Sequence, residues 1–172
     1  MKKSICTILV FTLLCAACLP IISFAETGNG TGETMWRDIT LSDEEFELVL
    51  SQGSSVSGEE NSVMASGLIT NYSIGISKSG STLTIAGRTQ CVTDVVKCGF
   101  SKVTIQRRAN SSSSWSNYQT YTSLYVDGYK YTLSKSLTVA SGYQYRVTCT
   151  HYAKKSLLST QKINNTSNTV TV

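Results

Sequence analysis

The chain is poor in proline, histidine and charge. Its 172 residues include one Pro and one His, and 15% are charged, whereas charged residues make up about a quarter of a typical soluble protein. The low charge excludes coiled coils and long solvent-exposed helices, which need charged faces. A length of this size fits one globular domain. Ser, Thr, Tyr and Asn occupy the positions that charge leaves, and this composition favours an all-β secreted domain.

Short motifs for nucleotide, metal or acid–base chemistry are missing. Phosphate loops, dinucleotide fingerprints and EF-hand loops do not occur. A Cys–His or Ser–His–Asp site would have to use His151, and Cys149 lies about 6.5–7 Å from it along an extended strand, too far for direct proton transfer. We therefore expect His151 to be a partly exposed residue near a strand end. Paired carboxylates are also scarce after residue 60, where Asp94 and Asp127 are the two acids. We predict a non-enzymatic protein with no cofactor and no metal.

The first 25 residues have the pattern of an export signal. Lys2 and Lys3 precede an apolar stretch over residues 5–24, and Ser23-Phe24-Ala25 places small side chains at the two positions read by signal peptidase. No basic stop-transfer flank follows, and the next residue is Glu26. We predict cleavage after Ala25, secretion, and no membrane span in the mature chain. A retained membrane anchor and a lipid-modified Cys18 are the alternatives.

Charge divides the mature chain into two regions. Residues 26–60 contain nine acids and one base, a net charge of −8, whereas residues 61–172 contain twelve bases and two acids, a net charge of +10. The first region reads as a mostly disordered leader, because its Gly- and Ser-rich stretches offer few apolar residues to bury. The second reads as a separate basic domain.

One short helix is predicted in the acidic leader, near residues 43–51. Ser42 and Glu45 form a capping box, in which each side chain accepts a hydrogen bond from the other residue's backbone N–H. Phe46, Val49 and Leu50 then share one face. A helix this short is marginal alone, so we expect it to form only if that face docks on another part of the protein.

From residue 68 onward the apolar residues recur every second position, and turn signals recur about every ten residues. This pattern is typical of an antiparallel β-sandwich of immunoglobulin-like type. A hairpin is expected at residues 78–81, and Asp127-Gly128 suits a second, type I′ hairpin turn. The predicted strands are 70–77, 82–90, 102–108, 115–125, 129–133, 136–140, 143–152 and 168–172.

Leu137, Tyr143 and Val147 lie at the spacing that precedes and enters the sixth strand of a fibronectin type III domain, and residues 61–172 resemble that family. The resemblance implies a tyrosine corner, in which the Tyr143 hydroxyl bonds to backbone a few residues upstream. The chain departs from the family at Gly87, where a Trp is usual.

Three cysteines remain after signal removal, so at most one internal disulfide forms. Cys91 and Cys98 flank one strand connection, and a bridge between them would contribute about 2 to 3 kcal/mol by loop closure. We predict the Cys91–Cys98 pairing, with a bridge from either residue to Cys149 as the alternative. Zinc bound by the three thiols and His151 is disfavoured, because no CxxC pair exists.

A cluster of aromatic and arginine residues marks the candidate binding face. Tyrosine offers a large contact area at a low entropic cost, and exposed aromatics beside arginines can receive a sugar ring, a peptide or an anionic polymer. The expected partner is an anionic cell-wall polymer, a glycan or a protein surface; nucleic acid is not expected, because no nucleic-acid-binding motif is present. The candidate residues are Arg107, Arg108, Trp115, Tyr118, Tyr121 and Tyr125.

Several blocks also resemble a family of small secreted proteins of unknown function from Gram-positive bacteria. They are Ser66-Gly67-Leu68-Ile69, Thr89-Gln90, Thr104-Ile105-Gln106-Arg107, Trp115, Gly142-Tyr143-Gln144-Tyr145-Arg146-Val147 and Thr150-His151-Tyr152-Ala153-Lys154. This resemblance implies export and a β domain, and it carries no activity.

Two alternatives to the binding module follow from the same residues. In one, the acidic leader is a mask or propeptide that docks its helix on the basic domain. In the other, the protein is a structural or self-assembling surface component.

Overall fold

A computed structural model describes residues 36–53 and 67–172. The predicted signal peptide, residues 1–25, lies outside the described residues, as do the parts of the predicted leader at 26–35 and 54–66. All described residues belong to one compact unit, Glu33–Val172. The helix of the acidic region and the basic β domain are therefore described together.

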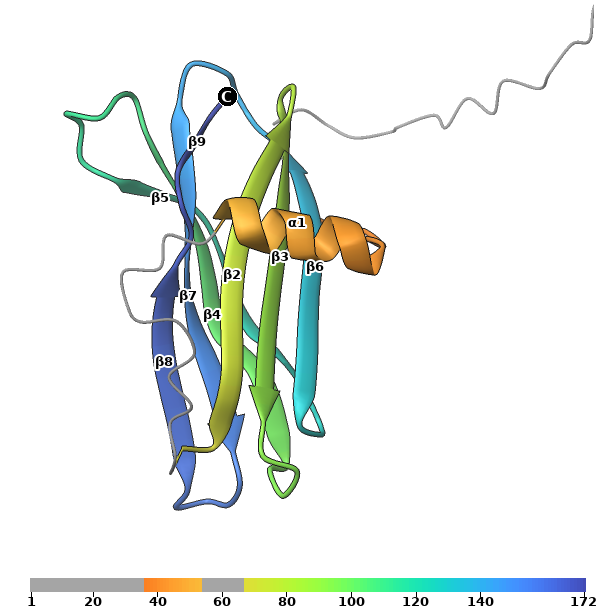
Figure 1. The fold of residues 1–172 in the computed structure, drawn as a ribbon. Helices are drawn as coiled ribbons and strands as arrows, with labels where there is room; N and C mark the ends of the chain where they lie inside the picture. Colours follow the sequence, from red (N-terminus) through yellow and green to blue (C-terminus); the bar gives the residue numbers. More distant parts are fainter. Residues whose placement is uncertain (1–35, 54–66) are drawn as a thin grey trace, which may run out of the picture. The chain divides into compact units, whose positions relative to one another are not determined.

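Two antiparallel sheets form the unit (Figure 1). The predicted all-β sandwich is confirmed, and so is one short helix, α1 (Asp43–Gly53). The first sheet, which we call sheet A, has the order β1 (Arg37–Asp38), β6 (Lys130–Thr138), β3 (Thr82–Cys91) and β2 (Ile69–Ser79). The second, sheet B, has the order β5 (Ser116–Val126), β4 (Lys97–Arg108), β7 (Gln144–Lys154) and β8 (Thr160–Thr166), with β9 (Val170–Thr171) also paired to β7.

The core lies between the sheets and follows the predicted alternation. In β7 every second residue is buried from Tyr145 to Ala153. Because successive strand side chains point to opposite faces, one half of each strand fills the core and the other half faces outward. The central apolar cluster includes Ile74, Ile76, Leu83, Ile85, Phe100, Val103, Ile105, Leu133, Leu137, Tyr145 and Val147.

The sandwich is immunoglobulin-like, with a difference in its fourth strand. In the constant-type arrangement four strands form the sheet opposite the third, sixth and seventh strands. Here β5 pairs with β4 and so joins the sheet that contains β7. The connection after β5 therefore crosses between sheets. The hairpin predicted at Asp127-Gly128 is wrong for this reason, whereas the hairpin at residues 78–81 is confirmed by the Ser79–Thr82 pairing.

Two strand predictions are corrected. The sequence predicts separate strands at 129–133 and 136–140, but β6 is continuous. Residues 134 and 135, which the prediction left between them, are part of this strand, and Lys135 pairs with Asp38 of β1. Strand β8 was not predicted, because it presents a single apolar side chain, Ile163, to the core side of sheet B. Edge strands need few buried residues, so period-two patterning is weak there.

Phe100 explains how the core is filled at Gly87. A side-chain carbon built at Gly87 would lie 2.8 Å from Phe100 Cζ and 3.0 Å from Ile74 Cδ1. The ring of Phe100 therefore reaches from sheet B into the space beside Gly87 on sheet A. A bulky residue at position 87 is incompatible with this packing.

The tyrosine corner is made by Tyr145 and not by Tyr143. The Tyr145 hydroxyl donates to the Ala140 carbonyl at 2.9 Å, and the Tyr145 side chain is fully buried. Tyr143 is half-buried at the edge of the core, beside Tyr145. Since Tyr145 lies in β7 with the inward parity of Val147, it is the ring that crosses the core to reach the upstream backbone.

Helix α1 crosses the outer face of sheet A. Its capping box is formed, with the Ser42 N–H donating to Glu45 Oε2 at 2.9 Å and the Glu45 N–H donating to Ser42 Oγ at 3.2 Å. The Ser42 N–H and the Ser42 hydroxyl, which also donates to Glu45 Oε2 at 2.9 Å, lower the pKa of the Glu45 carboxyl. The helix lies so close to β2 that a side-chain carbon at Gly75 would be 2.4 Å from the Val49 carbonyl. The predicted apolar face, Phe46, Val49 and Leu50, is buried with Ala86 beneath the helix.

The residues before the helix cover one edge of sheet A. Arg37 and Asp38 pair with Ser136 and Lys135 of β6, and the Ile39 N–H donates to the Ser134 carbonyl at 3.2 Å. Asp38 also forms an ion pair with Lys135. Residues 36–53 are thus part of the packed sandwich, first as an edge strand and then as a covering helix.

Candidate functional site

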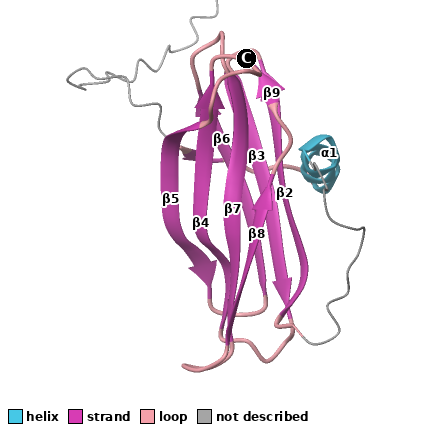
Figure 2. Cartoon of the chain, turned by 90° about the vertical axis from the view of Figure 1, so that its left-hand side faces the viewer, coloured by secondary structure: helices cyan, strands magenta, loops and turns pink. Residues whose placement is uncertain are grey.

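The two outer faces of the sandwich carry opposite charge. Over sheet A lies α1, with Asp43, Glu44 and Glu45 in its first turn. On sheet B, the residues that alternate with the buried ones in β4, β7 and β8 face outward, and several of them are Lys or Arg. The helix packs on Gly75 and Ala86, which face away from the core and so away from sheet B, and Figure 2 shows α1 beside β2, apart from the strands of sheet B. The outward cations of sheet B are Lys97, Lys102, Arg108, Arg146, Lys154 and Lys162.

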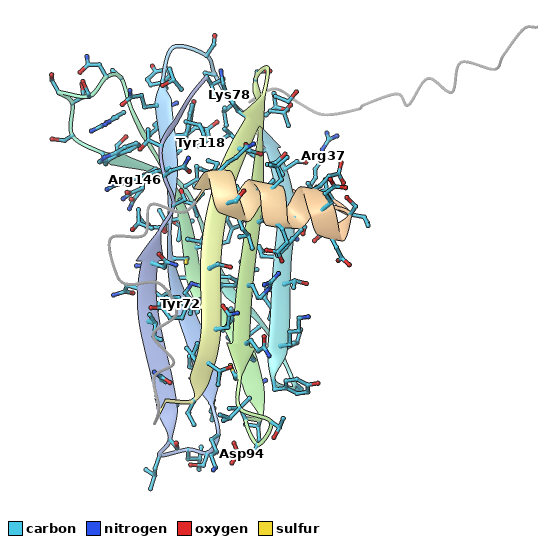
Figure 3. The ribbon with its side chains drawn as sticks, viewed as in Figure 1. Arg37, Tyr72, Lys78, Asp94, Tyr118 and Arg146 are labelled. Carbon is cyan, nitrogen blue, oxygen red and sulfur yellow. The ribbon has the colours of Figure 1, made fainter. Side chains whose placement is uncertain are left out.

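The two acids of the β domain lie away from most of these cations. Asp127 pairs with Lys97 at 3.1 Å, and Asp94 forms an ion pair with Lys155. Figure 3 shows Asp94 at one end of the sheets and Arg146 toward the other. Within residues 36–53 and 67–172, no carboxylate forms an ion pair with Lys102, Arg108, Arg146, Lys154 or Lys162.

The densest charge on this face surrounds Trp115. The guanidinium carbon of Arg108 lies 4.4 Å from the centre of the Trp115 ring, and that of Arg146 lies 4.3 Å from it. Stacking on an indole face stabilises a guanidinium through the ring quadrupole. Burial, and then the nearby charge of Arg108, lower the pKa of Arg146. All three side chains are partly buried.

Two glutamines orient the two arginines. Arg108 pairs across the strands with Gln144, and Arg146 pairs with Gln106, so the four residues form a two-by-two arrangement with the arginines on one diagonal. Arg108 Nε donates to Gln144 Oε1 at 2.8 Å, and Arg146 Nε donates to Gln106 Oε1 at 2.9 Å. Each guanidinium is therefore held by its inner nitrogen.

The predicted site residues do not all lie together. Arg108 and Trp115 lie together on the outer face of sheet B, as described. Arg107 lies at the core edge, with its guanidinium carbon 4.8 Å from the Tyr118 ring and 4.9 Å from the Tyr143 ring. Tyr118 also packs edge-on against buried Tyr145. These two residues therefore support the core end and do not join the Trp115 group.

Tyr121 and Tyr125 point to opposite sides of sheet B. Tyr121 packs on Trp36, with ring centroids 3.9 Å apart, and burial raises the pKa of its phenol. Tyr125 packs outward on Tyr152 at 5.4 Å, near Lys97. Strict alternation would put the two on one face, but Ser123 between them has a φ of 60° and shifts the parity. The six predicted residues are not one surface.

Arg146 is the member of the site that sequence reasoning missed. It lies in β7, far along the chain from the stretch around Trp115, and adjacency in sequence does not connect them. The available signal was parity: Arg146 lies between inward Tyr145 and Val147 and so had to face outward.

Cys91 and Cys98 lie next to each other, as their predicted pairing requires. Both are buried free thiols, and Cys91 Sγ lies 2.7 Å from Cys98 Sγ. The hydrogen bond to Cys98, and then burial, raise the pKa of the Cys91 thiol. Cys149 is also free and buried, but it contacts His151 instead. The Cys91–Cys98 bridge stays a prediction, and these geometries favour it over a bridge to Cys149.

His151 is fully buried, which corrects the expectation of a partly exposed residue. Its Nδ1 lies 2.8 Å from Thr89 Oγ1, and its Nε2 lies 3.4 Å from Cys149 Sγ. The side chains of Cys149 and His151 therefore incline towards each other, and the expectation that strand spacing keeps them apart is wrong. Thr89 Oγ1 donates to the Gly99 carbonyl at 3.0 Å.

One proton assignment satisfies all three of these contacts. Cys149 S–H donates to Nε2, Nδ1–H donates to the Thr89 hydroxyl, and the Thr89 hydroxyl donates to Gly99. Burial lowers the pKa of His151 to about 3 and raises the pKa of Cys149. Both groups are neutral and enclosed, so the pair supplies neither a thiolate nor an accessible base.

In the described ranges, no group of three or more His, Cys, Asp or Glu side chains is placed to hold a metal ion. None of the helices in the same ranges has the length and apolar character needed to cross a membrane. The chain matches no protein-family model, no curated protein and no solved structure.

Proposed function

We propose that the protein is a secreted, non-enzymatic binding module that attaches through the outer face of sheet B to an anionic cell-wall polymer or an acidic glycan. The observation that carries the proposal is the segregation of charge. Five outward cations of sheet B have no carboxylate partner in the described ranges, while the acidic helix lies on sheet A. A face that carries one sign of charge attracts a polymer of the opposite sign.

The charge pattern predicts both binding and its salt dependence. Exposed charges are screened beyond about 8 Å at physiological ionic strength. Retention on a polyanion should therefore be strong at low salt and should fall steeply as salt rises. Aromatic Trp115, Tyr125 and Tyr152 add apolar surface to the same face, which suits a sugar-containing polymer better than a simple polyphosphate.

A matched pair of double variants tests the face. Lys102→Gln with Lys162→Gln removes two exposed cations from sheet B, and Lys78→Gln with Lys130→Gln removes two exposed cations from sheet A. The net charge change is equal. Retention on a poly(glycerol phosphate) wall polymer and on a sulfated glycan is measured between low and physiological salt. We expect the sheet B variant to lose at least several-fold in affinity and the sheet A variant to stay close to the parent. Equal losses, or no retention of the parent at low salt, would overturn the proposal.

One observation supports the alternative in which the acidic leader masks the basic domain. The predicted apolar face of α1 is buried on the β domain, so the acidic region docks on it. The helix covers sheet A, however, and any mask of sheet B would act through charge rather than by covering the face. Asp43→Asn with Glu44→Gln removes two exposed acids without touching the Arg88–Glu47 ion pair. Stronger polyanion binding by this variant would support the mask, and unchanged binding would oppose it.

A further inference from the structure

The strongest unexplained feature of the molecule is a pair of arginines held together without an acid. Arg108 and Arg146 occupy diagonal positions on neighbouring strands and reach one indole ring. The two like charges repel each other, as the lowered pKa of Arg146 beside Arg108 indicates, and partial burial increases the repulsion. Among the described residues, no carboxylate pairs with either one.

The orientation of the two side chains leaves their outer nitrogens available. The Nε atoms are used by Gln144 and Gln106, and Arg108 Nη1 donates to the Ser111 carbonyl at 3.2 Å. In the described part of the chain, both Nη atoms of Arg146 and Nη2 of Arg108 have no hydrogen-bond partner. Fixing a guanidinium by its inner edge pre-orients its outer edge, which lowers the entropic cost of binding an anion.

The rest of the site is fixed as well. Gln106 Nε2 donates to Asn117 Oδ1 at 3.0 Å, which extends the polar network to β5. Trp115 is the last residue of the connection between β4 and β5 and contacts both guanidiniums. Three strands therefore contribute to a single small region, and the arginines do not depend on one flexible loop.

We propose that Arg108, Arg146 and Trp115 form a discrete site for one tetrahedral oxyanion group, phosphoryl or sulfuryl, carried by the polymer that sheet B binds. The two guanidiniums come from different strands and lie 4.4 Å and 4.3 Å from the centre of the same indole ring, so one bound group can meet both. A tetrahedral group offers oxygens in several directions, whereas a carboxylate presents two oxygens in one plane and satisfies a single fork. This inference rests on the proposed function and specifies its ligand chemistry.

The test uses the fluorescence of Trp115. The chain has two tryptophans, so Trp36→Phe leaves Trp115 as the reporter. The full mature chain with this substitution is titrated with inorganic phosphate, with sulfate and with acetate at constant ionic strength. We expect a saturable change with phosphate or sulfate, and none with acetate at the same concentration. An equal response to acetate, or no saturable response to any anion, overturns the proposal.

Arginine variants separate a shaped site from a general positive field. Arg146→Lys keeps the charge but removes the fork, and we expect it to weaken oxyanion binding at least tenfold, as Arg108→Gln should. Lys130→Gln, which removes one exposed cation from sheet A, is the charge-matched control and should leave oxyanion binding within twofold. Equal oxyanion binding by Arg146→Lys and the parent would contradict a role for the two-pronged guanidinium of Arg146. Thermal unfolding of each variant reports whether the sheet is intact.

Polymer binding distinguishes failure of the site from failure of the proposed function. If the parent retains polyanions while small oxyanions do not bind, the site is wrong and the charged face stands. If the parent does not retain polyanions either, both are wrong. Competition of the oxyanion signal by a phosphodiester oligomer and by a sulfated oligosaccharide then identifies which polymer carries the group.

Discussion

Cys91 Sγ lies 2.7 Å from Cys98 Sγ, in a buried position where β3 ends and β4 begins. Oxidation by oxidised glutathione or by an extracytoplasmic thiol–disulfide oxidoreductase would remove two protons and two electrons from the pair and form one S–S bond. We expect this bridge under oxidising conditions, with Cys149 remaining a thiol. Intact mass with and without alkylation checks it.

The stability effect of the bridge follows from the loop that it closes. Reduction should lower the free energy of unfolding by about 2 to 3 kcal/mol. Cys98→Ser should remove the difference between oxidised and reduced protein, and Cys149→Ser should preserve it. A mixed disulfide or a bridge that involves Cys149 would contradict the prediction.

Buried His151 predicts a loss of stability in acid. Its pKa is about 3 in the folded protein, below the ordinary histidine value of 6.5, because burial disfavours the charged ring. Between these two values the unfolded chain binds a proton that the folded chain does not, so stability falls as the pH drops from about 6.5 towards 3. The slope approaches about 1.4 kcal/mol per pH unit. The titratable side chains against the ring are Tyr72 and Cys149.

Urea unfolding between pH 7 and pH 4 measures this slope. His151→Gln keeps a polar side chain at the position and should reduce the slope in that window, even if it lowers stability at neutral pH. A parent protein whose stability is constant from pH 7 to pH 4 would show that the imidazole is not kept neutral by the fold.

The close packing of α1 on Gly75 leaves no space for a side chain at position 75. A carbon added there would be 2.4 Å from the Val49 carbonyl, so Gly75→Ala should displace the helix and cost about 1 to 3 kcal/mol. Phe46→Ala should cost about 3 kcal/mol, because it empties the buried face of the same helix. Leu48→Ala, on the exposed side of α1, is the control and should be close to neutral. Chemical denaturation gives all three values.

Replacement of Tyr by Phe should affect stability differently at positions 145 and 143. Tyr145→Phe removes the hydrogen bond to Ala140 and leaves the buried carbonyl without this donor, which should cost about 1 kcal/mol. Tyr143→Phe should change stability by less than about 0.5 kcal/mol. The reverse order of the two losses would restore Tyr143 as the corner residue.

The strands were largely predictable because both sheets bury one face. In β2, β3, β4 and β7 the alternation of apolar and polar residues in the sequence matches the alternation of buried and exposed side chains. It fails at β8, where Ile163 is the one apolar residue toward the core, and at Ser123, where a positive φ changes which face the next tyrosine takes. Local departures of this kind depend on pairing partners that the sequence does not reveal.

The candidate site was harder to predict because it depends on register. Arg108 and Trp115 are close in sequence, whereas Arg146 joins them only through the pairing of β4 with β7. The capping box and apolar face predicted α1 correctly, but sequence could not tell which sheet the helix covers. That choice decides which face keeps its positive charge.

The pairing of β1 with β6 and the burial of Phe46 have a consequence for any later processing of the chain. A protease cut within residues 54–66 would break the covalent link without undoing the contacts that hold residues 36–53. The product would run as two fragments under denaturing conditions and as one species in native separation. For this protein, cleavage and release would be two separate events.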